Sequence, residues 1–330
     1  LIQQGDSYTM CSVLFSGMPA VVMLMDTDNS IFGPDNRAIA EVRVFQPGDE
    51  AEPYTVYSAE AKVSLRGTSS INYDKKSYNV TLYDGQGLRS KLPLLGMPNS
   101  DQWILKSLLM DPMRMRECVT STIWNNICSS SDANLQTSEF RYAELFLDDS
   151  YDGLFGLMRK IDIESEYQLD VDKDVYFKAN TFDFLRHLDP EFVEPAFLES
   201  GIQFPEVWRD GLYDPIYWYV DAMYLDNSTS SYEEILSRLN LPNIADYSLF
   251  FMLVTARDNY YTNTIYVFRG NGDSFETTLI PWDMDMTLGN SWNNVWEGGP
   301  ISLAKTQEVY LPREIETLTR YDSEGTHALL

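Results

Sequence analysis

Two groups of side chains that carry oxygen atoms flank a hairpin-like pattern in the last third of the chain. Asp258 and Asn263 precede a first apolar run, and Asp283 and Asp285 follow a second one. The Gly-Asn-Gly-Asp sequence between the two runs is typical of a β-hairpin turn. Because the first strand of a hairpin begins beside the end of the second, we expect Asn263 and Asp283 to lie next to each other.

Carboxylate and amide oxygens in this arrangement suit a hard cation, Mg²⁺ or Mn²⁺, and such sites commonly complete their ligand shell with substrate phosphates. Without a cation, two carboxylates about 4 Å apart repel each other by roughly 4 kcal/mol at an effective dielectric constant near 20. The pattern therefore predicts that the two clusters converge on one spot and that a positive group, such as a cation, lies there. The spacing leaves an alternative open, in which Asp258 caps a turn and the two later aspartates are solvated loop acids.

A second polar segment, residues 65–78, concentrates basic side chains around a Gly-Thr-Ser-Ser turn between two expected strands. The N–H groups and hydroxyls of such a turn can face an anion, and a half-buried lysine needs a partner such as a phosphate. Strand alternation places Lys76 on the face of Tyr78, so we expect Lys76 to point inward and Lys75 outward. The alternative is an ordinary hairpin turn with lysines in solvent. The residues expected to face the anion are Arg66, Gly67, Ser69, Ser70 and Lys76.

Composition limits the classes of partner. The 330 residues include 24 basic and 50 acidic side chains, for a formal net charge of -26. This balance argues against nucleic acid, whose phosphates require many lysines and arginines, and fits an extracellular protein. The sequence has no apolar run of about 18 residues, so we expect no membrane span. A targeting signal is not recognisable, and we expect any native signal to lie outside this sequence.

The expected fold class is α+β. The first half contains alternating strand patterns and one helix, which opens with Asp111 as N-cap and Pro112 at the first helical position. The second half is expected to be mostly helical, with the hairpin described above. The strand patterns are residues 19–28, 37–48, 54–67, 75–87 and a hairpin at 141–162, and the helical patterns of the second half are residues 215–226, 231–240 and 243–258.

Three cysteines, Cys11, Cys118 and Cys128, exclude a disulfide framework and a zinc site of the Cys-x-x-Cys type. One bridge at most is possible, and unpaired buried thiols are the favoured expectation. Whether Cys118 and Cys128 pair stays open.

Together the two polar segments have the layout of phosphoryl transfer in protein kinases. There a β-rich lobe supplies a small-residue loop and a lysine for phosphates, and a helical lobe supplies Asp-x4-Asn and a later metal-binding Asp. Asp258 and Asn263 match the Asp-x4-Asn spacing. Of the usual His-Arg lead-in only Arg257 is present, and there is no Asp-Phe-Gly, which excludes a standard kinase signature.

At these residues the chain resembles the spore-coat-protein-H (CotH) kinase family of atypical kinases. The resemblance runs from Leu65 to Gly289 and rests on "RGTSS", "KKSY", "LLGMPNSDQWIL", "DPMRMR", "YDGLFGLMRKID", "DNYYTN" and "IPWDMDMTLG", in that order. It implies a two-lobed kinase-like fold, with residues 1–165 as the β-rich N-lobe and 166–330 as the helical C-lobe. It also implies transfer of the γ-phosphate of ATP to serine in secreted or surface proteins, with Mg²⁺ or Mn²⁺.

The resemblance also implies individual roles. Asp258 is the expected catalytic aspartate, and Asn263, Asp283 and Asp285 are the expected metal ligands. Lys76 and Arg66 are expected to contact the phosphates. Arg116 matches the arginine that opens the family's helix and is expected at the nucleotide.

One residue departs from the family pattern: Arg159, in "GLFGLMRK", stands where many members have an acid. If that acid pairs with the nucleotide-site lysine, a cation there puts catalysis in doubt, although Glu117 could supply the partner. A catalytically inactive module of a spore coat or cell surface is therefore the alternative function. A carbohydrate-active enzyme that uses Asp283 and Asp285 is disfavoured, because side chains two apart on a strand project the same way.

Overall fold

A computed structural model of the chain describes residues 2–4, 7–9, 17–26, 36–48, 54–67, 70–128, 135–148, 150–178, 201–224, 230–256, 259 and 263–290. The chain divides into two compact units. Unit 1 comprises residues 1–107 and 141–158, and unit 2 comprises residues 108–140 and 159–330.

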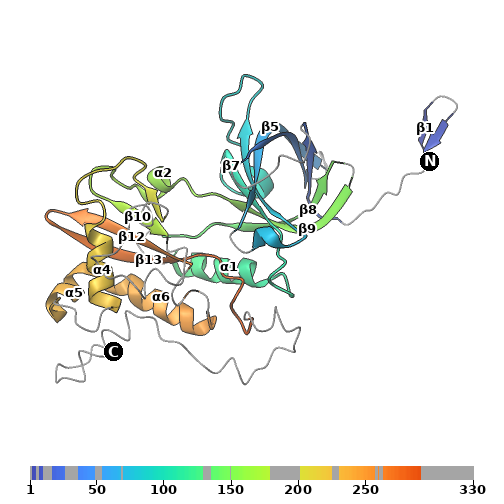
Figure 1. Cartoon of the computed structure of the whole chain (residues 1–330). Helices are drawn as coiled ribbons and strands as arrows, with labels where there is room; N and C mark the ends of the chain where they lie inside the picture. The colour runs from blue at the N-terminus through green and yellow to red at the C-terminus, as the bar shows by residue number, and fades with distance from the viewer. Residues whose placement is uncertain are drawn as a thin grey trace. The chain divides into compact units, whose positions relative to one another are not determined.

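Unit 1 is a closed barrel whose strands follow the order β3-β4-β5-β6-β7-β9-β8 (Figure 1). Neighbouring strands from β3 to β7 are antiparallel, and β3 closes the barrel by a parallel pairing with β8. The strands are β3 (Ala20–Met25), β4 (Ala38–Pro47), β5 (Tyr54–Arg66), β6 (Ser77–Tyr83), β7 (Gln102–Lys106), β8 (Phe140–Leu147) and β9 (Ser150–Arg159). A short ribbon of β1 (Ile2–Gln4) and β2 (Ser7–Thr9) precedes the barrel in sequence, and 3-10 turns occur at Ser70–Asn72 and Leu94–Gly96.

Alternation along the strands builds the core of the barrel. In β4, Ala40, Val42 and Val44 are buried, whereas Ile39, which precedes Ala40 and lies on the opposite face of the strand, is 49% exposed. In β6 the face of Tyr78, Val80 and Leu82 is buried, as the sequence predicts. The strand patterns of the first half are confirmed, because each apolar side chain at every second position reaches the same interior.

Unit 2 contains a four-stranded antiparallel sheet in the order β11-β10-β12-β13. Its strands are β10 (Val175–Lys178), β11 (Ile202–Phe204), β12 (Thr264–Asn271) and β13 (Ser274–Pro281). The helices of this unit are α1 (Arg116–Cys128), α2 (Ile163–Tyr167), α4 (Asp214–Tyr224), α5 (Tyr232–Arg238) and α6 (Leu241–Leu253). Figure 1 shows α5 and α6 running beside β13.

Aromatic side chains join the helices of unit 2 to each other and to its sheet. The ring of Trp124 on α1 contacts Tyr247 and Phe250 on α6, with ring centroids 6.0 and 5.2 Å apart. Tyr219 on α4 packs edge-on against Tyr266 of β12 at 4.9 Å. The inward side of α6 predicted from its spacing is confirmed, since Ile244, Tyr247, Phe250, Phe251 and Val254 are all buried.

The α+β class is confirmed, but two details of the expected layout are wrong. The second half is not helical around a lone hairpin, because β10 and β11 extend the hairpin to a sheet. These strands have four and three residues, too few for a period-two pattern to stand out. The compact units also divide the chain differently from lobes at 1–165 and 166–330, since α1 belongs to the aromatic core of unit 2.

Two further expectations concern the membrane and the cysteines. No helix of the described ranges has the length and apolarity needed to cross a membrane. Cys118 and Cys128 do not form a disulfide bond in the structure, and Cys11 lies outside the described residues. Burial, with a smaller contribution from Asp246, raises the pKa of the Cys128 thiol to about 12, so this thiol is uncharged at neutral pH.

Candidate functional site

The hairpin of β12 and β13 brings two of the expected metal ligands to one place. Thr264 pairs with Pro281 at its open end, and the N–H of Trp282 donates to the carbonyl of Asn263 at 3.0 Å. Asp283 follows directly. Asn263 and Asp283 both have left-handed backbone conformations, with φ of 56° and 57°. The backbone of Asn263 therefore lies beside Trp282, one residue beyond the last ladder pair, and Asp283 is the next residue along the chain.

A buried asparagine holds this open end together. The Nδ2 group of Asn259 donates to the carbonyl of Asn263 at 2.8 Å and to the carbonyl of Trp282 at 2.7 Å. Asn259 is only 4% exposed, and the Thr264 hydroxyl donates to its carbonyl at 3.2 Å. Its own Oδ1 has no hydrogen-bond partner among the described residues. One side-chain amide group thus bonds to the backbone at both the start and the end of the hairpin.

A lysine lies at the same end of the sheet. Lys178 is the last residue of β10, where it pairs with Ile265 of β12. Its Nζ lies 4.4 Å from the centre of the Trp282 ring, a cation–π contact that places a positive charge near the residue preceding Asp283. A positive group beside a carboxylate cluster lowers its repulsion, and it also attracts an anionic ligand.

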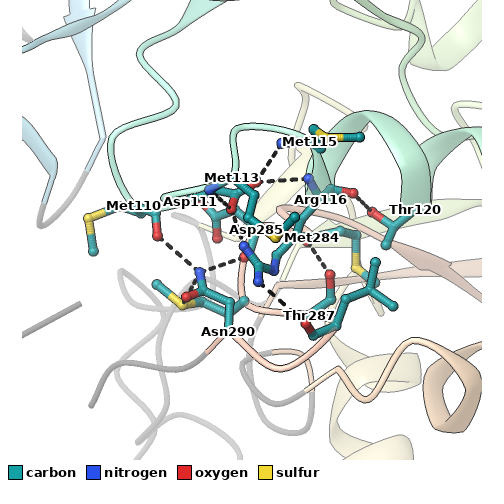
Figure 2. Close-up of polar contacts among 12 residues, drawn as sticks. Met110, Asp111, Met113, Met115, Arg116, Thr120, Met284, Asp285, Thr287 and Asn290 are labelled. Atoms are coloured by element: carbon teal, nitrogen blue, oxygen red, sulfur yellow. Dashed lines mark hydrogen bonds and ion pairs between the residues drawn. The ribbon is translucent and has the colours of Figure 1, made fainter. Parts of the chain in front are cut away.

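The loop after β13 is held at its far end by a second buried asparagine. The Nδ2 group of Asn290 donates to the carbonyl of Asp285 at 2.9 Å and to that of Met110 at 3.0 Å (Figure 2). Thr287 donates its hydroxyl to the carbonyl of Met284 at 2.8 Å. The carboxylates of Asp283 and Asp285 therefore belong to a loop whose backbone is bonded at both ends.

A buried ion pair lies beside this loop. The Arg116 guanidinium bonds to the Asp111 carboxylate, with both side chains 2–3% exposed, and its Nη2 donates to the carbonyl of Leu288 at 3.4 Å (Figure 2). The same carboxylate accepts the backbone N–H groups of Met113, Met115 and Arg116 at 2.8–3.0 Å. Asp111 therefore caps the start of α1 as expected, although the helix begins four residues later than a cap at this position implies. The contact of Arg116 with nucleotide stays a prediction.

Part of the expected site lies outside the residues that the structure describes. Asp258 is not among the described residues, and Asp285 and Asp283 are half-buried. No group of three or more His, Cys, Asp or Glu side chains gathers around a common point in the described part of the chain. The donor set of two carboxylates and an amide oxygen nevertheless fits Mg²⁺ or Mn²⁺, which take oxygen ligands and keep waters in their shell.

In unit 1 the turn between β5 and β6 carries the other expected residues. Arg66 pairs with Ser77 where the two strands meet, and Gly67 follows with φ of 112°, a conformation that favours glycine. Ser69 and the side chain of Ser70 lie outside the described residues. The ammonium of Lys76 donates to the carbonyl of Ile71 at 2.8 Å and also to that of Tyr73. Lys76 thus braces the turn.

The orientation expected for the two lysines is wrong. Lys75, not Lys76, reaches across the barrel unit, where its Nζ donates to the carbonyl of Leu154 on β9 at 2.6 Å and lies 4.2 Å from the ring centre of buried Phe155. Strand β6 begins only at Ser77, so the alternation used to orient the lysines does not extend to them. Burial raises the pKa of nearby Asp152, against an opposing effect of Lys75.

Arg159 has an acidic partner of its own. Its Nη1 and Nη2 bond to the two carboxylate oxygens of Glu166 on α2, at 2.5 and 2.7 Å. Glu166 also accepts the backbone N–H of Asp162 at 2.7 Å. This bidentate pair neutralises the buried cation within unit 2.

The sequence reasoning missed Asn259, Asn290 and Lys178. The two asparagines stand inside or directly after the motifs "DNYYTN" and "PWDMDMTLG", and this position was the available signal. The β10 lysine gave none, because its strand was not recognised.

Comparison with known proteins gives one match to a family. Residues 63–320 match the family model described as CotH kinase protein, which covers most of the chain. A comparison with curated protein sequences gave no match.

Proposed function

The chain belongs to the CotH kinase family, and we propose that it is an ATP-dependent protein kinase that uses Mg²⁺ or Mn²⁺. Its acceptor would be a serine, or a similar hydroxyl, of a secreted or surface protein. The observation that carries the proposal is the open end of the β12–β13 hairpin, where one buried amide holds the carbonyl of Asn263 and that of Trp282, the residue before Asp283. An extracellular site of action and a kinase-like, two-lobed arrangement of the two units are parts of the same proposal.

In the proposed reaction Asn263, Asp283 and Asp285 would hold the metal, which when bound neutralises phosphate charge. Asp258 would orient the acceptor hydroxyl and take its proton. The hydroxyl oxygen forms a bond to the γ-phosphorus while the bond from that phosphorus to the bridging oxygen of ADP breaks, and ADP leaves. Lys76 and Arg66 would contact the phosphates, and Arg116 would bind the nucleotide.

The inactive-module alternative depends on Arg159. An unpaired cation at this position would compete with the phosphate-binding lysine for acidic groups, but the bidentate bonds to Glu166 satisfy its charge locally. This pairing leaves Arg159 without excess charge, which is compatible with the proposed active kinase.

The proposal is tested by incubating the purified chain with Mn²⁺ and ATP labelled at the γ-phosphate, with and without an acidic acceptor protein. We expect the wild type to incorporate label and Asp258→Ala to fall to background, because the acceptor hydroxyl loses its base. Asp273→Ala is the matched control, since Asp273 is exposed in the turn at the opposite end of the same hairpin. Equal incorporation by wild type and Asp258→Ala would overturn the assignment.

A further inference from the structure

We propose that Asn259 is a positioning residue that sets the backbone of both expected metal ligands in the hairpin, Asn263 and Asp283. This inference rests on the proposed function, because it concerns the same metal site. It adds a residue that touches neither metal nor substrate but decides where the ligands point.

The two bonds of Asn259 act on the peptide planes next to the ligands. The carbonyl of Trp282 belongs to the peptide that leads into Asp283, and the carbonyl of Asn263 belongs to the peptide that leads out of Asn263. The Asn259 amide holds these oxygens at 2.7 and 2.8 Å. Because one Nδ2 group holds both oxygens, it links the two planes, and the bond from the Trp282 N–H to the Asn263 carbonyl keeps the two strand ends together. Rotation of either plane would swing the adjoining ligand side chain.

The backbone at both ligands has a left-handed conformation. Asn and Asp adopt this conformation more readily than other residues with a side chain, and the bonds of Asn259 hold it in place here. Asn263 and Asp283 both adopt it, with φ of 56° and 57°. Metal-bearing side chains commonly depend on partners of this kind, whose loss weakens metal binding about 10- to 100-fold.

Asn259 is itself firmly placed. It is 4% exposed, and its carbonyl accepts the hydroxyl of Thr264, which shares a 2.7 Å hydrogen bond with the hydroxyl of Tyr247 on α6. The backbone of Asn259 is thus linked through Thr264 to helix α6 of the unit 2 core, which fixes the position from which its side-chain amide reaches the hairpin end.

A purely structural asparagine in the same unit serves as the matched control. Asn243 on α6 is 7% exposed, donates through Nδ2 to the carbonyl of Leu279 at 3.1 Å and accepts the N–H of Leu279 at 2.7 Å. It binds the same strand, β13, but away from its open end. Removal of either amide takes away two hydrogen bonds to backbone groups, which lowers stability by a similar mechanism.

The test measures binding of Mn²⁺ alone to the full chain, by electron paramagnetic resonance of the free ion, at a temperature where every variant is folded by circular dichroism. We expect Asn259→Ala to raise the Mn²⁺ dissociation constant about 10- to 100-fold, with Asn243→Ala within about threefold of wild type. Asn259→Gln keeps the amide but displaces it by one methylene group. It is expected to fold where alanine does not and still to weaken Mn²⁺ binding.

Asp283→Asn separates failure of the inference from failure of the proposed function. If Asp283→Asn binds Mn²⁺ as tightly as wild type, the metal site itself is misassigned and the proposed function is overturned with it. If Asp283→Asn binds weakly while Asn259→Ala and Asn259→Gln bind like wild type, Asn259 does not position the ligands. Loss of Mn²⁺ affinity in both Asn243→Ala and Asn259→Ala would likewise overturn the inference. It would show that a loss of stability anywhere in unit 2 weakens Mn²⁺ binding.

Discussion

The open end of the β12–β13 hairpin in unit 2 and the β5–β6 turn in unit 1 are held in different ways. At the hairpin, a 4% exposed amide and the register of two strands hold the backbone. At the turn, two half-buried lysines hold it, one bonded to the carbonyls of its own turn and the other to β9. Metal ligands require a fixed geometry, whereas phosphate contacts through long, flexible side chains tolerate adjustment. The more rigid of the two frameworks therefore lies at the end of the hairpin where we propose that the metal ligands converge.

The largest expected effect comes from the buried framework of unit 2. Arg116→Met leaves the Asp111 carboxylate buried without its cation, so we expect the free energy of unfolding to fall by about 3–5 kcal/mol. Urea denaturation followed by tryptophan fluorescence measures it. The double variant Asp111→Asn with Arg116→Met should recover most of the loss. A loss below about 1 kcal/mol for the single variant would show that the pair does not support this unit.

A smaller effect is expected from unit 1. Lys75→Met removes the hydrogen bond to the Leu154 carbonyl and the cation–π contact with Phe155, which should cost about 1–3 kcal/mol in the same urea assay. Lys76→Met should cost less stability but lower the thermal stabilisation produced by ATP with Mn²⁺. The contrast between the units fails if Lys75→Met destabilises the protein as much as Arg116→Met does.

The last effect concerns a tyrosine of unit 1 and is seen only at high pH. Burial, together with the charge of Asp152, raises the pKa of Tyr78 to about 12 from an unfolded value near 10. The folded state therefore keeps the phenol proton at a pH where the unfolded state loses it, and stability falls as pH rises from about 10 to 12. Tyr78→Phe should flatten this decline in the urea midpoint. An unchanged slope would show that Tyr78 does not titrate with folding.

Local patterns account for the features that the sequence predicted well. The hairpin followed from its turn and two apolar runs, and its register then placed Asn263 beside Trp282 and Asp283. The inward side of α6 followed from its helical spacing. In each case the information is carried by residues a few positions apart.

The features that were missed depend on contacts distant in sequence or on exact boundaries. The side-chain amide of Asn259 bonds to the carbonyl of Trp282, which is 23 positions later in the sequence. The spacing of residues in the sequence does not reveal this bond. The predicted orientation of the two lysines was wrong because the strand alternation was applied to two residues that precede the start of β6 at Ser77. Helix α1 was started too early because Asp111 reaches its N–H groups across a turn in which Arg114 has a φ of 56°.

The most direct test of a metal-dependent kinase site at the hairpin is the initial rate of γ-phosphate transfer from ATP as a function of Mn²⁺ concentration, in wild type and Asp283→Asn. The account predicts a saturable dependence on Mn²⁺ for wild type and a rate at least about 100-fold lower for Asp283→Asn at every concentration. Equal rates for the two proteins would contradict it.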